Sequence, residues 1–476
     1  MLKPQLPRLT KNLALLGLLP IFFTACRDSG VTELKPNEIA DLNKPGTVMI
    51  QATHQAEITV PDYQVDEGKL EAWLSQNRSS LAQVGSEAKI LALIIQEVFT
   101  NPLEYLAPSN EIIRKNPEAT SQGSGFIVSD NGYVVTNAHV VSSEGDELKR
   151  ELATSALREI AIANCKEFMA ELGSDGQEML AQTIGTQELI ELCLSGSLDY
   201  YAEYLEIGDV ERSVKAIVAP ASPQVEQKTY ISDVKAEGKP APGKDVAVLK
   251  IDADNLPTVQ LGDAEAITTG DPTFVLGYPA GADIGDKPEP SLTSGLISAE
   301  KTMPDGWEVF QTNAAISPGN SGGPVFNKQG DAVAVATFGS VDPQTGQKIE
   351  GINFAIPSDI IKEYLSQANV EPQTGRLTEL YREGIKLMGQ QRYRSALSKF
   401  EEIEDLNPEF PYIQQKITQV RKDLIDHPES HLPWIVGGGA GIAGLAAVGF
   451  WLVRRSRKPP AVSTPQPEVA LSHEKV

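Results

Sequence analysis

Three separate segments of the sequence carry side chains that together could hydrolyse a peptide bond. Ser321 lies in the glycine-rich run Ser-Pro-Gly-Asn-Ser-Gly-Gly-Pro. Glycines beside a serine let the backbone turn sharply, so that the amides of Gly319 and Ser321 can point together at a developing negative charge. A serine hydroxyl becomes a nucleophile when a neighbouring base accepts its proton. The run therefore predicts a nucleophile at Ser321 and an oxyanion hole formed by the amides of Gly319 and Ser321.

The base is predicted to be His139, which ends the segment Val-Val-Thr-Asn-Ala-His. A strand, a turn at Asp-Asn-Gly (130–132) and a second strand would deliver its imidazole at a strand end. His54 is the rival, but it lacks this setting. The remaining histidines lie beside or beyond an apolar C-terminal segment: His427, His431 and His473.

Asp245 is the expected orienting acid because it opens the hydrophobic strand Asp-Val-Ala-Val-Leu-Lys-Ile. A carboxylate that enters such a strand is partly buried and needs a partner. An imidazole N–H supplies one and is thereby held in the tautomer that accepts a proton from serine. Taken alone, Asp245 could equally be a turn residue.

Elements that could position these side chains follow from the apolar pattern. Short apolar runs punctuated by Gly, Pro, Asp and Asn start at Ser121 and return between about 210 and 357, which predicts a mainly β barrel domain. We place this domain at 46–370, with helical periodicity at 66–101. The break at 144–207 has helical spacing and an excess of acidic residues, so it predicts an acidic helical insertion. Because it follows His139 closely, we expect the insertion to gate or extend the cleft.

The motifs resemble the HtrA or Deg group of trypsin-like serine proteases. This resemblance covers about half of the chain and implies a trypsin-like double β-barrel with His139, Asp245 and Ser321 in the cleft between the barrels. It also implies an acyl-enzyme at Ser321 with no cofactor and no metal. The matching stretches, in chain order, are Gly123–Phe126, Thr136–Val141, Asp245–Lys250, Leu276–Pro279, Thr293–Gly295, the Ser321 motif and Phe354–Pro357.

The resemblance also suggests a specificity pocket. In trypsin-like enzymes the sixth residue before the serine lies at the base of the primary pocket, and here it is Ala315. An uncharged, small or medium apolar side chain before the scissile bond is therefore expected. The family usually carries a PDZ domain after the protease, and none is recognisable in this sequence. The region before Ser121, which often carries trimer contacts in the family, also differs, so trimerisation is not carried over.

Residues 374–425 are similar to a tetratricopeptide repeat, a helix pair whose apolar and small residues recur at fixed spacing. About one and a half repeats fit, so the unit needs a neighbour to bury its apolar face. An ordinary helical hairpin is the alternative. A protein partner at this TPR-like region is a further expectation.

The N-terminus predicts export. Lys3, Arg8 and Lys11 precede an apolar run, and residues 1–25 are typical of a signal peptide. The run ends at Phe-Thr-Ala-Cys, which resembles a bacterial lipobox with Cys26 as the acylated residue. A plainly cleaved signal or an uncleaved anchor is the alternative. Residues 26–45 would then form a tether.

Near the other end, 434–453 is an uncharged, mostly apolar stretch long enough for one transmembrane helix. Arg454, Arg455, Arg457 and Lys458 follow it, and the positive-inside rule places the tail 454–476 in the cytoplasm. The protease domain would then face the periplasm or another extracytoplasmic space, attached to the inner membrane through the Cys26 lipid and the span.

The remaining cysteines, Cys165 and Cys193, form an even pair in an exported protein, which favours a disulfide over two free buried thiols. The chain carries 41 Lys and Arg against 64 Asp and Glu, a formal net charge of -23. This balance excludes a nucleic-acid partner, because phosphate binding needs clustered cations.

The sequence thus predicts a membrane-attached serine endopeptidase that cleaves exported or membrane-adjacent proteins, in protein quality control or a stress response. The alternative is a catalytically silent binding scaffold that uses the TPR-like region.

Overall fold

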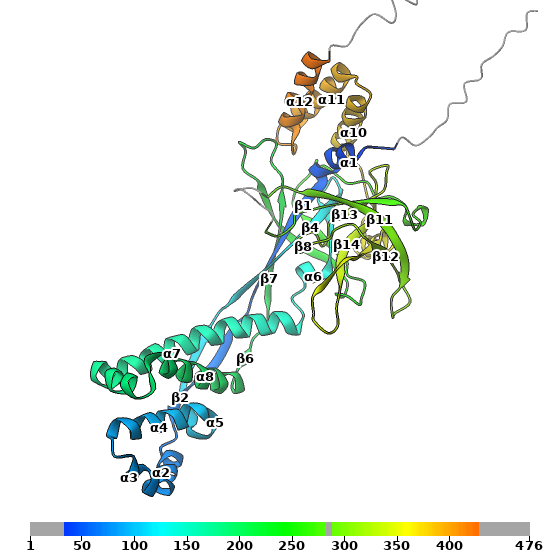
Figure 1. Ribbon diagram of the computed structural model, residues 1–476. Coiled ribbons are helices and arrows are strands. Elements are labelled where there is room, and N and C mark those ends of the chain that lie inside the picture. The colour runs from blue at the N-terminus through cyan, green and yellow to red at the C-terminus, as the bar shows by residue number, and fades with distance from the viewer. Residues whose placement is uncertain (1–32, 282–287, 428–476) are drawn as a thin grey trace, which may run out of the picture.

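The computed structural model describes residues 33–281 and 288–427, and it contains two closed antiparallel barrels (Figure 1). The first barrel has the strand order β1 (Thr47–Gln55), β4 (Glu118–Ser129), β5 (Tyr133–Thr136), β9 (Ala247–Ile251), β8 (Lys228–Glu237) and β7 (Glu211–Val218). The second has the order β10 (Pro272–Gly277), β11 (Ser291–Thr302), β12 (Glu308–Thr312), β15 (Lys348–Pro357), β14 (Ala332–Val341) and β13 (Pro324–Phe326). The fold is therefore a mainly β, trypsin-like double barrel with helical additions.

The barrel strands form where apolar residues alternate. In β1, Val48, Ile50 and Ala52 are fully buried while the residues between them are partly exposed. Side chains of a strand alternate between its faces, so this spacing fills one side of the sheet. α9 (Ser358–Gln367) follows the second barrel, and its Ile361 and Leu365 pack into the core shared by both barrels. The short helices η1 (Lys44–Gly46), η2 (Ala264–Ala266) and α6 (Ala138–Val141) lie in connections.

A helical arm projects from the first barrel (Figure 1). Strands β1 and β4 are continued by β2 (Ile58–Val65) and β3 (Leu106–Lys115), which pair with each other, and β2 also pairs with β6 (Glu206–Ile207). The helices of this arm are α2 (Glu67–Gln76), α3 (Arg78–Val84), α4 (Glu87–Thr100), α5 (Pro102–Tyr105), α7 (Asp146–Ile184) and α8 (Thr186–Glu203). The predicted helical segment 66–101 and the predicted insertion 144–207 thus form one unit.

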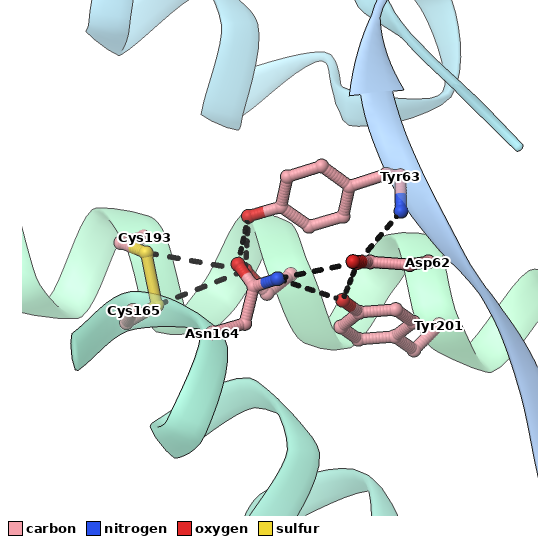
Figure 2. Close-up of a disulfide and its surroundings, with 7 residues drawn as sticks. Asp62, Tyr63, Asn164, Cys165, Cys193 and Tyr201 are labelled. Atoms are coloured by element: carbon pink, nitrogen blue, oxygen red, sulfur yellow. Dashed lines mark hydrogen bonds between the residues drawn. A yellow bond between two sulfur atoms is a disulfide. The ribbon is translucent and has the colours of Figure 1, made fainter. Parts of the chain in front are cut away.

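Within the arm, a disulfide joins α7 to α8, and hydrogen bonds attach both helices to β2 (Figure 2). Cys165 of α7 and Cys193 of α8 form a disulfide, as expected from the sequence. Beside it, the Asp62 carboxylate accepts from the Tyr201 hydroxyl at 2.9 Å and from the Asn164 side chain at 3.3 Å. These bonds hold both helices against β2.

The insertion does not reach the catalytic cleft. α7 begins shortly after α6, but it runs away from the barrels (Figure 1). In the part of the chain that the structure describes, no residue of α7 or α8 lines the cleft. The expectation that the insertion gates the cleft is therefore not met, because its apolar face is occupied by α4, β2 and β3.

The C-terminal helices α10 (Arg376–Gly389), α11 (Tyr393–Leu406) and α12 (Ile413–Asp426) share a core with α1 (Pro36–Asn43). Leu377, Leu380, Tyr381 and Ile385 recur at helical spacing and are buried. The expected tether 26–45 is consequently corrected, because its described part contains α1, whose Leu42 packs in this core. Helices α10–α12 thus bury their apolar faces against α1 and against Ala221, which follows β7.

The expected signal peptide, Cys26, the transmembrane stretch 434–453 and the tail 454–476 lie outside the described residues. Within 33–281 and 288–427, no helix combines the length and apolar character needed to cross a bilayer.

Replacing the fully buried Phe400 with alanine is expected to lower the stability of the C-terminal helices by about 3 to 5 kcal/mol, because its ring fills the space beside Tyr381. The matched change Leu406→Ala removes a half-exposed side chain of the same helix and is expected to cost below about 1 kcal/mol. Native-state hydrogen exchange of α10–α12 measures both. Equal loss of protection in the two variants would contradict the packing described here.

Candidate active site

The carboxylate of Asp245 is the best-partnered group of the site. It lies just before β9 and is 1% exposed. One oxygen accepts from the backbone amide of His139 at 2.8 Å, and the other lies 2.6 Å from Nδ1 of the His139 ring. The Thr337 hydroxyl also donates to that second oxygen at 2.6 Å. The predicted partnership of Asp245 and His139 is therefore present in the geometry, and Thr337 joins it from the second barrel.

His139 is positioned by α6, the single helical turn after β5. The side-chain amide of Asn137 donates to the Asp245 carbonyl at 2.7 Å, which fastens this turn to the start of β9. The imidazole is 39% exposed, in contrast to its buried carboxylate partner. With Nδ1 held by Asp245, the other ring nitrogen, Nε2, is the one left to act in the cleft.

The turn around Ser321 depends on glycine at two positions. Gly319 has φ +92°, and a Cβ there would lie 2.3 Å from the Tyr278 carbonyl oxygen. Gly322 has φ +87°, and a Cβ there would lie 2.1 Å from the Ser124 carbonyl oxygen. Side chains are excluded at both positions by backbone conformation and by contact. The hydroxyl of Ser124 donates to the Gly319 carbonyl at 2.7 Å and holds the turn against the first barrel.

This turn leaves two backbone donors free. Among the described residues, the amides of Gly319 and Ser321 donate to no protein acceptor, although Asn320 between them donates to the Ser317 carbonyl at 2.9 Å. Unpaired amides beside a nucleophile are the donors that an oxyanion requires. The geometry is thus consistent with the oxyanion hole expected from the sequence.

His139, Asp245 and Ser321 line one cavity of about 510 Å³. Ser321 Oγ donates to the Thr337 carbonyl at 2.9 Å, and in the described residues no hydrogen bond joins it to His139. Catalytic hydrogen bonds are often loose without substrate and tighten when substrate binds. The other lining residues are Gln122, Pro240, Ala241, Ile316, Ser317, Pro318, Gly319, Thr337, Phe338, Gly339, Val341 and Lys348.

The rival histidine, His54, lies elsewhere. It is at the end of β1, is 3% exposed and does not line the cavity. Burial lowers the pKa of its imidazole. Because it does not line the cavity, His54 is not part of the site that contains His139.

The expected specificity residue Ala315 does not line the cavity. Ala315 is exposed and is not among the residues that line the cavity, whereas its neighbours Ala314 and Ile316 are buried. Ile316 lines the cavity. The role of Ala315 at the base of a specificity pocket stays a prediction. The sequence reasoning also missed Thr337 and Lys348, which enter the cleft from β14 and β15.

Comparison with known proteins agrees with this geometry. Residues 123–335 match the family described as trypsin-like peptidase domain. A probable periplasmic serine endoprotease DegP-like of Halomonas elongata is 31% identical over 303 residues, which is 62% of this chain and 45% of that relative. Residues 123–335 are thus similar to trypsin-like peptidase domains, and the chain is similar to DegP-like serine endoproteases.

Other similar proteins are more distant. A probable periplasmic serine endoprotease DegP-like of Pseudomonas putida strain F1 is 30% identical over 262 residues, covering 54% of this chain and 37% of the relative. The chain thus spans less than half the length of these curated relatives. A solved structure, HtrA-type protease AlgW with decapeptide, is 20% identical with a TM-score of 0.35, covering 71% of this chain and 68% of that one.

Asp245→Asn is expected to lower kcat for peptide hydrolysis by about 10³- to 10⁴-fold, because an amide has a single acceptor oxygen and no charge. It therefore cannot accept from both Nδ1 and the backbone amide of His139, and it does not stabilise an imidazolium. Asp252→Asn changes an exposed residue that directly follows β9, and it serves as the matched control. Steady-state kinetics on a peptide substrate measure both. Comparable rates for the two variants would remove Asp245 from the site.

Proposed function

We propose that this protein is a serine endopeptidase that cleaves polypeptides through an acyl-enzyme, with His139, Asp245 and Ser321 as its catalytic residues. The observation that carries the proposal is the shared cavity in which the Asp245-bound imidazole and the Ser321 hydroxyl both lie. The HtrA-like domain and the unpaired amides of Gly319 and Ser321 support it further.

The steps follow from the donors and acceptors of the cleft. Rotation of Ser321 Oγ away from the Thr337 carbonyl lets it give its proton to His139 Nε2 as the oxygen attacks the scissile carbonyl carbon. The negative charge that forms on the carbonyl oxygen is stabilised by the amides of Gly319 and Ser321. The imidazolium, held by Asp245, then protonates the leaving amine. Water repeats the sequence on the ester and releases Ser321.

The cellular setting is part of the proposal. The DegP-like relatives are named periplasmic, and the disulfide of the arm suits an oxidising compartment. In the sequence, Cys26 precedes α1 and residues 434–453 follow α12, and both segments are proposed for membrane attachment. These helices are joined by the Lys416–Asp41 ion pair at 2.7 Å, at the end of the molecule opposite the arm (Figure 1). We propose that the arm points away from the membrane.

The substrates proposed are exported or membrane-adjacent proteins, in quality control or a stress response. A protein partner at the TPR-like region 374–425 is a further part of this proposal. The alternative scaffold would leave the cleft unused. It is disfavoured by the buried Asp245, whose carboxylate makes two hydrogen bonds with His139 and accepts a third from the Thr337 hydroxyl.

A fluorophosphonate probe is expected to label wild-type protein at Ser321 and to leave Ser321→Ala unlabelled, because only an activated serine attacks phosphorus. Ser174→Ala is the matched control, since Ser174 is exposed in the distant arm. Mass spectrometry of the labelled peptide identifies the site. An unlabelled wild type with intact fold would favour the scaffold.

A further inference from the structure

The part of the cleft beside Ser321 holds a cation that the proposed reaction does not use. Lys348 begins β15 and is paired with Val341 of β14, and both side chains line the cavity. Among the described residues that line the cleft, Lys348 is the only lysine or arginine. The only carboxylate in that lining belongs to Asp245, which is already bonded to His139 and Thr337. Among the described residues, Lys348 therefore has no ion-pair partner in the cleft.

Contacts hold this ammonium against the wall that precedes the nucleophile. Lys348 Nζ donates to the carbonyl of Ile316, which is the wall residue in the same cavity. Gly339 of β14 leaves room for the Lys348 side chain, since a Cβ at position 339 would lie 2.6 Å from Lys348 Cε and 3.4 Å from Nζ. A larger residue at 339 would displace the lysine. The ammonium is thus placed in the space bounded by Ile316 and Gly339.

This space must receive the side chain that precedes the scissile bond. The carbonyl carbon under attack sits at Ser321 Oγ, with its oxygen toward the amides of Gly319 and Ser321. The side chain of that same residue then extends into the adjoining space between the segment before Ser321 and β14. Ile316, Gly339 and Lys348 bound this space.

The donors of Lys348 are only partly used. An ammonium has three N–H donors, and one is directed at the Ile316 carbonyl. Lys348 is exposed at the mouth of the cleft, and in the described part of the chain no carboxylate lies within 4.0 Å of its Nζ. A carboxylate accepts hydrogen bonds and carries the opposite charge, so it fits the unused donors. An incoming lysine or arginine would meet like charge.

We infer that Lys348 makes the enzyme select an acidic residue, glutamate or aspartate, immediately before the scissile bond. This inference rests on the proposed function. It replaces the expectation of an uncharged apolar side chain, which depended on Ala315. The substrate class is therefore polypeptides with accessible acidic side chains.

Four synthetic peptides that differ only before the scissile bond, with Glu, Gln, Val or Lys, test the inference. The expected kcat/KM for Glu exceeds that for Gln by about 10- to 100-fold, the range of a charge-assisted hydrogen bond, and Lys is cleaved slowest. In Lys348→Met the Glu-to-Gln ratio falls to about 1, while Lys348→Arg keeps a ratio well above 1. Lys301→Met removes an exposed lysine of the same barrel and keeps the wild-type ratio.

The outcomes separate the two proposals. Cleavage of the peptides with a Glu-to-Gln ratio near 1 in the wild type, or an unchanged ratio in Lys348→Met, overturns the acidic preference and leaves the endopeptidase standing. If folded wild-type protein neither cleaves the peptides nor reacts with the fluorophosphonate, the endopeptidase proposal and the acidic preference are both overturned. Thermal melts of each variant show whether its fold is retained.

Discussion

A buried carboxylate that must be satisfied from both barrels is the constraint on which the site depends. Asp245 is withdrawn from water, and a charge in that position is tolerated only with hydrogen-bond partners. His139 supplies two bonds from the first barrel and Thr337 supplies one from the second. The two barrels therefore cannot shift against each other without leaving the carboxylate unpaired. The same contacts bring the imidazole to the cleft that Ser321 lines.

The turn that carries Ser321 depends on backbone conformation. Gly319 and Gly322 hold conformations and contacts that no side chain permits, and the turn they make leaves the amides of Gly319 and Ser321 unpaired. Ser124 of the first barrel fastens this turn through its hydroxyl. The nucleophile and its base thus come from different barrels, and polar contacts across the interface set their relation.

The sequence was most informative where a local backbone requirement marks the chain. The glycines around Ser321, the strand that opens at Asp245 and the strand end at His139 are all visible in short motifs. Lys348 was missed because it enters the cleft only through its pairing with Val341, a register that no short motif records. Ala315 was chosen by counting back from Ser321, and such a count does not say which neighbouring residues line the cavity, as Ile316 does.

The sequence predicts each helical segment separately, but it does not predict how the segments pack together. Periodicity marks 66–101 and 144–207 as helical, but only the structure shows that they join in one arm, away from the cleft. α1 was read as a tether because it is short and polar, with Ile39 and Leu42 as its main apolar residues. Its burial depends on the C-terminal helices, which lie far along the chain.

The most direct measurement is a crystal structure of the protein with a peptidyl phosphonate bound. The account predicts phosphorus bonded to Ser321 Oγ, a phosphonyl oxygen accepting from the amides of Gly319 and Ser321, and His139 Nε2 within about 3 Å of Oγ or the adjacent oxygen. An adduct on another residue, or an imidazole that stays out of reach of Ser321 in the complex, would contradict it.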